Sequence, residues 1–299
     1  MLKKFKYREV TWIDLESPTG EELGAVGREY GLQPIVRGEL EGPTTRAKVD
    51  IYSDFIYAVF HFPRGLLGHP TPVIERDYIE IDFIIGKNFL ITTHYELVNA
   101  LNDFSKIFEA DFMLKRNHDP LHAGFVFYYI IKEIYRSLEL GLGYLNDRLR
   151  LVGRDIFAGR EKEVVRILAD INHELLDSRW ALKQHHQLFT SLALAGPEFF
   201  GHDFRHHLAV LTGEHDRVWN MIESNHATFL DLRETNDSLL SIKNNEVVKM
   251  LTAIAVTFLP LNLIVQVFAV PAANRSLMFS LMAAGFLVTF WVIKKRRWL

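Results

Sequence analysis

The chain has 299 residues, a formal net charge of −3 and no cysteine. Without cysteine, disulfide bonds, thiolate nucleophiles and zinc–thiolate sites are excluded, and the length allows two domains of about 100–200 residues each. Charged residues are scattered as far as Lys249, but between residues 250 and 293 the only charge is Arg275. This break in composition predicts a large soluble part followed by a membrane-embedded C-terminus.

The first 95 residues indicate a mixed α/β domain. Their start is basic but has no apolar run, so we expect no cleavable signal peptide. Two runs rich in β-branched and aromatic residues flank the turn at 86–88 and predict a β-hairpin. The expected strands cover residues 10–15, 49–62 with a turn near 53–54, 78–83 and 89–94, and a helix is expected over 21–30.

From about Leu97 the pattern becomes helical. Two amphipathic runs, 125–157 and 161–195, are separated by Ala158-Gly159, and Gly196-Pro197 is expected to end the second run.

A third helix is expected to begin near Phe199 or His202 and to continue into the apolar C-terminus. No proline interrupts it before residue 249. Its length of about 65–70 residues corresponds to about 100 Å at 1.5 Å per residue. A helix of this length has to pack in a bundle or a coiled coil.

Two apolar segments are long enough to be transmembrane spans. The first covers residues 250–270 and contains Pro260, the second covers 276–293, and the hinge at 271–275 is short enough to make them a helical hairpin. The tail 294–297 holds four consecutive cations, which the positive-inside rule places in the cytoplasm. Both termini, and therefore residues 1–249, are expected to be cytoplasmic.

Polar residues of the first span follow a repeat of four and three residues. The repeat indicates one face of the helix, and its members are Ser241, Asn245, Val248, Thr252, Ala255, Leu259, Asn262 and Gln266. Uncharged amides and hydroxyls in a bilayer need partners or water. Two interpretations are equally compatible with the spacing: a pore lined by amide rings that hold a hydrated divalent cation, or hydrogen bonds between helices of an oligomer.

Several motifs resemble the CorA family of magnesium transporters. Residues 245–252 match the family's NEVxKxLT run before the membrane, and 258–260 match its FxP feature. The basic tail 294–299 ends in Trp-Leu, as in the family. The N-terminal stretches 12–18, 46–48 and 86–94 are also similar, so the resemblance covers nearly the whole chain.

The resemblance implies an α+β chain: an N-terminal α/β cytoplasmic domain (1–120), a cytoplasmic helical bundle and stalk helix (121–249) and a transmembrane hairpin with a basic tail (250–299). It further implies a funnel-shaped homopentamer around a central pore. By position, the pore would be lined by Asn245, Thr252, Leu259, Asn262 and Gln266, gated by Leu251 and Leu259, and entered past Glu234 and Asp237. The two leucine rings would gate by dewetting.

The chain departs from the family at its signature motif. Where relatives carry Gly-Met-Asn at the outer end of the first span, this chain has Ala269-Val270-Pro271. The outer loop has no acidic residue and contains Arg275, which would repel cations. The regions of the family's cytoplasmic sensing site, 33–39 and 211–215, are also altered.

Histidines are concentrated between residues 173 and 226. His202 and His206 are spaced i, i+4, which would bring both rings to one ion on a helix face. A zinc or cobalt sensing site and an ordinary polar helix surface both fit this spacing. No nucleophile elbow, phosphate-binding loop or zinc-protease motif is present, so we expect no enzyme.

Two functions follow from these features. The first is a channel or transporter of the inner membrane for a divalent cation (Mg²⁺, Co²⁺, Zn²⁺ or Ni²⁺), with no permanently bound cofactor. Its partners would be membrane lipid and further copies of itself, and not nucleic acid. The second is a non-conducting membrane-anchored sensor or scaffold of the same architecture, which the replaced outer motif favours.

Overall fold

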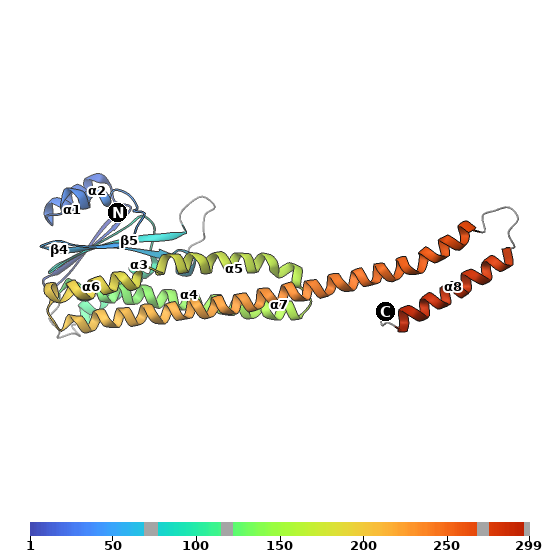
Figure 1. The fold of residues 1–299 in the computed structure, drawn as a ribbon. Coiled ribbons are helices and arrows are strands. Elements are labelled where there is room, and N and C mark those ends of the chain that lie inside the picture. Colours follow the sequence, from blue (N-terminus) through green and yellow to red (C-terminus); the bar gives the residue numbers. More distant parts are fainter. Residues whose placement is uncertain (69–76, 115–121, 268–274, 296–299) are drawn as a thin grey trace. The chain divides into compact units, whose positions relative to one another are not determined.

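The computed structural model describes residues 1–68, 77–114, 122–267 and 275–295 (Figure 1). The chain forms two compact units: Met1–Arg154 with Val164–Leu232, and Asp155–Glu163 with Arg233–Leu299. The predicted three-part division at residues 120 and 249 stays a prediction.

The first unit is built on a six-stranded sheet with the order β1-β2-β6-β5-β4-β3. Only β2 and β6 pair in parallel, and the other neighbours are antiparallel. The strands are β1 (Leu2–Tyr7), β2 (Val10–Glu16), β3 (Lys48–Ile51), β4 (Phe55–Pro63), β5 (Tyr78–Gly86) and β6 (Phe89–His94). The predicted strands and the β5–β6 hairpin are confirmed. β1 was not predicted; its lysines suit an edge strand, because exposed charge there discourages pairing with other chains.

Two short helices, α1 (Gly20–Glu29) and α2 (Pro34–Glu39), cover one face of the sheet (Figure 1). α1 begins with a capping box, in which the Thr19 side chain accepts from the Glu22 amide and Glu22 accepts from the Thr19 amide. Val26 and Val36 point from these helices into a core with Tyr57 and Ile91 of the sheet. α2 was not predicted, because six residues show too little periodicity to be recognised.

The other face of the sheet packs on long helices through aromatic residues. Phe60 of β4 lies 6.2 Å from Phe127 and 5.5 Å from Phe189, measured between ring centroids. These two rings come from α4 (Ala123–Phe157) and α6 (His185–Phe200). At the other end of the sheet, Trp12 packs 5.4 Å from Phe104 of α3 (Asn99–Leu114). The central strands are therefore buried on both faces, which explains their continuous apolar runs.

The helices differ from the prediction between residues 161 and 204. The second amphipathic run is two helices, α5 (Glu161–Leu182) and α6, that meet at Lys183-Gln184. Pro197, expected to end the run, lies inside α6. It removes a single backbone hydrogen bond near the end of α6, and α6 then stops at Gly201, whose φ is 91°.

A buried histidine lies at the break between α5 and α6. His185 is fully buried; its Nε2 donates to the carbonyl oxygen of His61 (2.9 Å), and its Nδ1 therefore accepts from the Tyr135 hydroxyl (2.7 Å). Burial lowers the pKa of His185 to about 3, so the ring stays neutral in this tautomer. A buried contact of this kind, between residues far apart in the chain, carries no signal in local periodicity.

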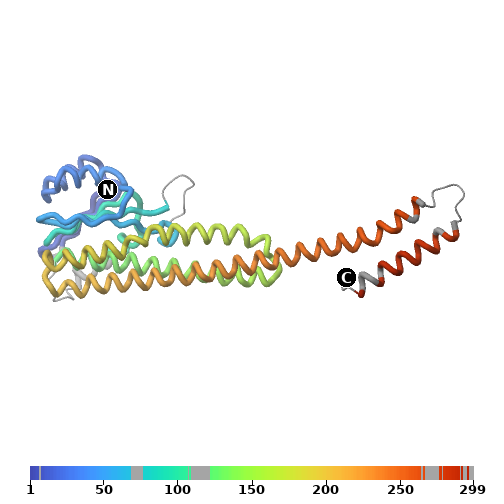
Figure 2. The backbone as a smooth tube through the Cα atoms, viewed as in Figure 1, coloured from blue at the N-terminus to red at the C-terminus, as the bar shows by residue number. Residues whose placement is uncertain are grey.

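Helix α7 (Phe204–Val267) is continuous over 64 residues (Figure 2). It is followed by α8 (Arg275–Lys295), which begins after the residues that the structure does not describe. The predicted long third helix is confirmed, with its start moved to Phe204.

Candidate functional site

The N-terminal part of α7 is held in the first unit by a strict heptad pattern. Its buried positions alternate in steps of four and three: Phe204, Leu208, Leu211, His215, Val218, Ile222, Asn225 and Phe229. Polar members of this face are paired: His215 Nε2 donates to the carbonyl of Leu182 (3.1 Å), and Asn225 Nδ2 donates to the carbonyl of Leu142 (3.2 Å). This face therefore belongs to the bundle.

Beyond Asn236 the exposure of α7 changes. Asn236 is the last buried residue of the heptad face, and all residues from Ser241 to Met250 are exposed. Asn245 is among them. At about 100° per residue it lies about 160° around the helix from Lys243, which contacts Glu161. The side of the helix that carries Asn245 is thus free of this contact.

Most of the predicted stripe is exposed within the apolar segment. Leu251 and Leu259 are 60% and 69% exposed, Asn262 and Gln266 are exposed, and Thr252 is half-buried. Ala253, which is buried, and Thr257, which is half-buried, lie off the stripe. A spacing of nine residues sets Asn262 opposite Ala253, and Gln266 opposite Thr257, at about 180°.

The two hydroxyls of this segment are satisfied by their own helix. Thr252 Oγ1 donates to the carbonyl of Val248, and Thr257 Oγ1 donates to that of Ala253, both at 2.8 Å. Neither needs a partner from another helix. The amides of Asn262 and Gln266 therefore carry the polarity of this face.

The predicted entrance residues Glu234 and Asp237 are both exposed on α7. Asp237 lies 4.0 Å from Arg233 one turn earlier, a solvent-exposed pair that constrains the carboxylate little.

The predicted histidine site at His202 and His206 stays a prediction. His202 lies in the turn before α7 and His206 in its first turn, and both are exposed. Among the residues that the structure describes, no group of three or more histidine, aspartate or glutamate side chains could hold a metal ion. The replaced signature motif Ala269, Val270 and Pro271, and the tail 296–299, lie outside the described residues.

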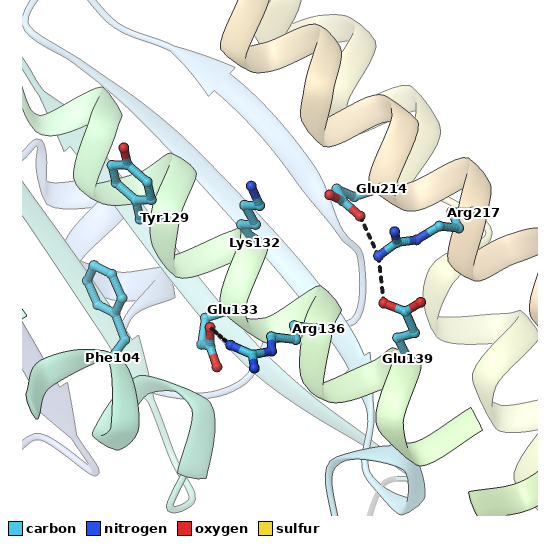
Figure 3. Close-up of a pocket in the computed structure, with 8 residues that line it drawn as sticks. All are labelled: Phe104, Tyr129, Lys132, Glu133, Arg136, Glu139, Glu214 and Arg217. Carbon is cyan, nitrogen blue, oxygen red and sulfur yellow. Dashed lines mark hydrogen bonds and ion pairs between the residues drawn. The ribbon is translucent and has the colours of Figure 1, made fainter. Parts of the chain in front are cut away.

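A polar pocket in the first unit was not predicted. It has a volume of about 360 Å³ and lies between α3, α4 and α7, where Arg217 bridges Glu139 (2.5 Å) and Glu214 (3.0 Å) (Figure 3). Phe104 and Tyr129 line its apolar side, and Lys132, Glu133 and Arg136 complete the lining. Opposite charges are balanced in number, so the pocket has no net attraction for one sign of ion.

The sheet also contains a buried charged histidine that the sequence did not reveal. His94 Nδ1 faces the carbonyl oxygen of Glu96 (2.5 Å), and Nε2 faces Asp14 Oδ1 (3.1 Å). Both partners are acceptors, so both ring nitrogens donate and the ring is an imidazolium. Burial is the largest single influence and opposes this charge, but the hydrogen bond to Asp14, the charges of Asp14 and Glu16 and the Glu96 carbonyl together outweigh it, and the pKa of His94 is raised.

Within the described residues, α7 is the one helix both long and apolar enough to cross a membrane; the described apolar part of α8, Phe279–Thr289, is shorter. By its length and composition, α7 gives the chain the architecture of a membrane-anchored protein: an α/β domain followed by a long helix with an apolar end.

The family within this class is shown by sequence. The model of a family described as CorA-like Mg²⁺ transporter protein matches residues 7–295. The chain therefore belongs to the CorA-like family.

Two CorA proteins are distant in sequence from this chain but match it over most of their own length. The cobalt/magnesium transport protein CorA of Methanocaldococcus jannaschii is 21% identical, over 99% of this chain and 93% of the relative. The protein of the same name from Thermotoga maritima is 19% identical, over 86% and 72%.

Solved structures share the fold. The complete structure of the CorA magnesium transporter from Methanocaldococcus jannaschii superposes with a TM-score of 0.82 at 19% identity, covering 99% of this chain and 93% of that chain. The structure of the full-length CmaX protein gives a TM-score of 0.73 at 16% identity, covering 97% and 89%. The α/β soluble domain and the long helix are thus confirmed as the family fold.

Proposed function

We propose that this chain transports divalent metal cations across the inner membrane. In this proposal, flux is passive and follows a central pore on the axis of a homopentamer. Residues 250–270 and 276–293 are its two spans, and both termini lie in the cytoplasm. The chain catalyses no reaction. The metal ion is its cargo and not a resident cofactor.

The exposed amide face of α7 carries the proposal. Asn262 and Gln266 lie in an otherwise apolar segment, and the protein itself leaves them uncovered. An amide facing hydrocarbon would lose its hydrogen bonds at a cost of several kcal/mol. Copies of α7 standing in parallel around an axis would turn these amides toward one another and toward water.

Such a ring suits a hydrated cation. Mg²⁺ sheds its water reluctantly, so carbonyl oxygens of Asn245, Asn262 and Gln266 would accept hydrogen bonds from the ion's water shell. Leu251 and Leu259 are exposed on α7, and rings of these side chains would close the pore by dewetting. Glu234 and Asp237 would raise the local concentration of cations at the entrance.

The identity of the transported ion is proposed from two observations: the names of the relatives and the chemistry of the amide oxygens. Relatives named cobalt/magnesium transport proteins match nearly the whole chain, and amide oxygens are suitable hard ligands for Mg²⁺ and tolerable ones for Co²⁺, Ni²⁺ and Zn²⁺.

The decisive test removes the amides without changing the volume much. We expect Asn262→Leu with Gln266→Leu to abolish flux of Mg²⁺, Co²⁺, Ni²⁺ and Zn²⁺ into liposomes loaded with a metal-sensitive dye, while the oligomer persists in native mass spectrometry. Thr257→Val is the matched control, because Thr257 is polar, lies in the same segment and bonds its own backbone. Undiminished flux in the double variant would remove the pore assignment.

A second function is favoured by one sequence feature. Ala269-Val270-Pro271 replaces the family's signature and Arg275 follows in the outer loop, which fits a non-conducting sensor or scaffold with the same architecture. Absence of flux for every divalent ion, together with an intact oligomer in the unaltered protein, would establish this alternative.

A further inference from the structure

The segment between α4 and α5 contacts the stalk part of α7. Lys243 Nζ donates to Glu161 Oε2 (2.5 Å) and lies 3.4 Å from the carbonyl oxygen of Gly159. Glu161 is only 4% exposed, and the hydrogen bond from Lys243 lowers its pKa. The segment Asp155–Glu163 belongs to the same compact unit as residues 233–299, although 82 positions separate Glu161 from Lys243.

The segment is shaped to present these acceptors. Gly159 has a φ of 86°, a conformation that other residues adopt only with strain. The Arg160 amide donates to the carbonyl of Asp155 (3.0 Å), and the Arg160 guanidinium pairs with the Asp155 carboxylate. The turn is therefore closed on itself, and Glu161 follows at the start of α5.

The place of Lys243 on α7 is important for the proposed conduction. Lys243 lies two residues before Asn245, the first amide of the proposed pore, and on nearly the opposite side of the helix. Without Glu161 each copy of α7 would bring an uncompensated ammonium to this level of the stalk. Several such charges around one axis would repel a divalent cation.

We propose that Glu161 is a positioning residue for the pore: it neutralises Lys243 and holds its ammonium away from the axis just before the ring of Asn245. This inference rests on the proposed function. It assigns a role in conduction to the turn Asp155–Glu163, which lies outside the pore itself.

The flux test uses a charge cycle in the full-length protein in liposomes. We expect Glu161→Gln to lower divalent-cation flux about fivefold at low salt, with the loss shrinking as ionic strength rises, because screening weakens the freed charge. Adding Lys243→Gln to this variant should restore the flux. Glu163→Gln is the matched control: it removes an equal charge in the same first turn of α5, from an exposed position.

A second measurement separates this inference from the proposed function. Hydrogen–deuterium exchange of the amides at 155–163 should rise in Glu161→Gln and in Lys243→Gln, and stay unchanged in Glu163→Gln. If the unaltered protein conducts but Glu161→Gln matches Glu163→Gln in flux at every salt concentration, the role of Glu161 is overturned and the pore stands. Unchanged exchange in both variants would overturn the contact itself. If the unaltered protein conducts no divalent ion, the proposed function fails and this role fails with it.

Discussion

Two glycines of α4 should respond in opposite directions to the same substitution. A Cβ added at Gly141 would lie 2.4 Å from the carbonyl oxygen of Leu66 and 3.0 Å from its Cα, whereas a Cβ at Gly143 would meet nothing within 4 Å. Leu66 belongs to the short 3₁₀ turn η1 (Gly65–Leu67) after β4. The obstacle is therefore backbone and cannot rotate away.

The magnitudes follow from helix propensity and overpacking. Replacing glycine by alanine inside a helix stabilises by about 1 kcal/mol, and this gain applies at both positions. Forcing an extra methyl group into a packed contact costs about 1–3 kcal/mol, and the approach to backbone puts Gly141→Ala at the upper end. We expect a net loss of about 2 kcal/mol for Gly141→Ala and a gain of about 1 kcal/mol for Gly143→Ala.

Both changes in stability can be measured by thermal unfolding of the full-length variants in detergent, monitored by far-UV circular dichroism. At about 2–4 °C per kcal/mol for a domain of this size, Gly141→Ala should melt several degrees lower and Gly143→Ala a few degrees higher than the unaltered protein. Equal shifts of the same sign would refute the close approach of α4 to η1.

Two further predictions concern buried charge in the sheet. His94 has a raised pKa in the folded protein. Its contribution to the free energy of unfolding is therefore complete below the pKa of an unfolded histidine, about 6.5, and is lost as pH rises through the raised value. Replacing His94 by leucine should lower the free energy of unfolding by about 3 kcal/mol, because Asp14 is left buried without its cation. The variant should also show a flatter dependence of stability on pH. If chemical denaturation at several pH values gives the same slope of stability against pH as in the unaltered protein, the imidazolium is contradicted. Asp82 is fully buried, accepts one hydrogen bond from Tyr57 (3.3 Å), and burial raises its pKa well above the usual range. Stability should therefore fall as pH rises from about 4 toward that raised value. Asp82→Asn should be more stable than the unaltered protein at pH 7 but not at pH 4. Unfolding midpoints of the two proteins, compared at both pH values, test this; an equal difference at both would refute it.

The sequence by itself determined the features that repeat locally. Alternation and turn residues predicted β2, the β3–β4 pair and the β5–β6 hairpin, and the period of about 3.5 predicted α4, the long α7 and the amide face at Asn262 and Gln266. The break in charge after Lys249 predicted where a membrane part would begin. Family motifs are also local, so residues 245–252 were sufficient to suggest a family that a match over residues 7–295 then established.

Only the tertiary structure decided the features that depend on distant partners. At the junction of α5 and α6, His185 bonds Tyr135 and the backbone of His61 across 50 and 124 positions. The i, i+4 spacing of His202 and His206 predicted that both lie on one helix, whereas α7 begins between them. Glu161 contacts Lys243, and Gly141 lies against Leu66, through packing that no local pattern encodes. Periodicity shows which side of an element is apolar, but not which side chain will cover that side.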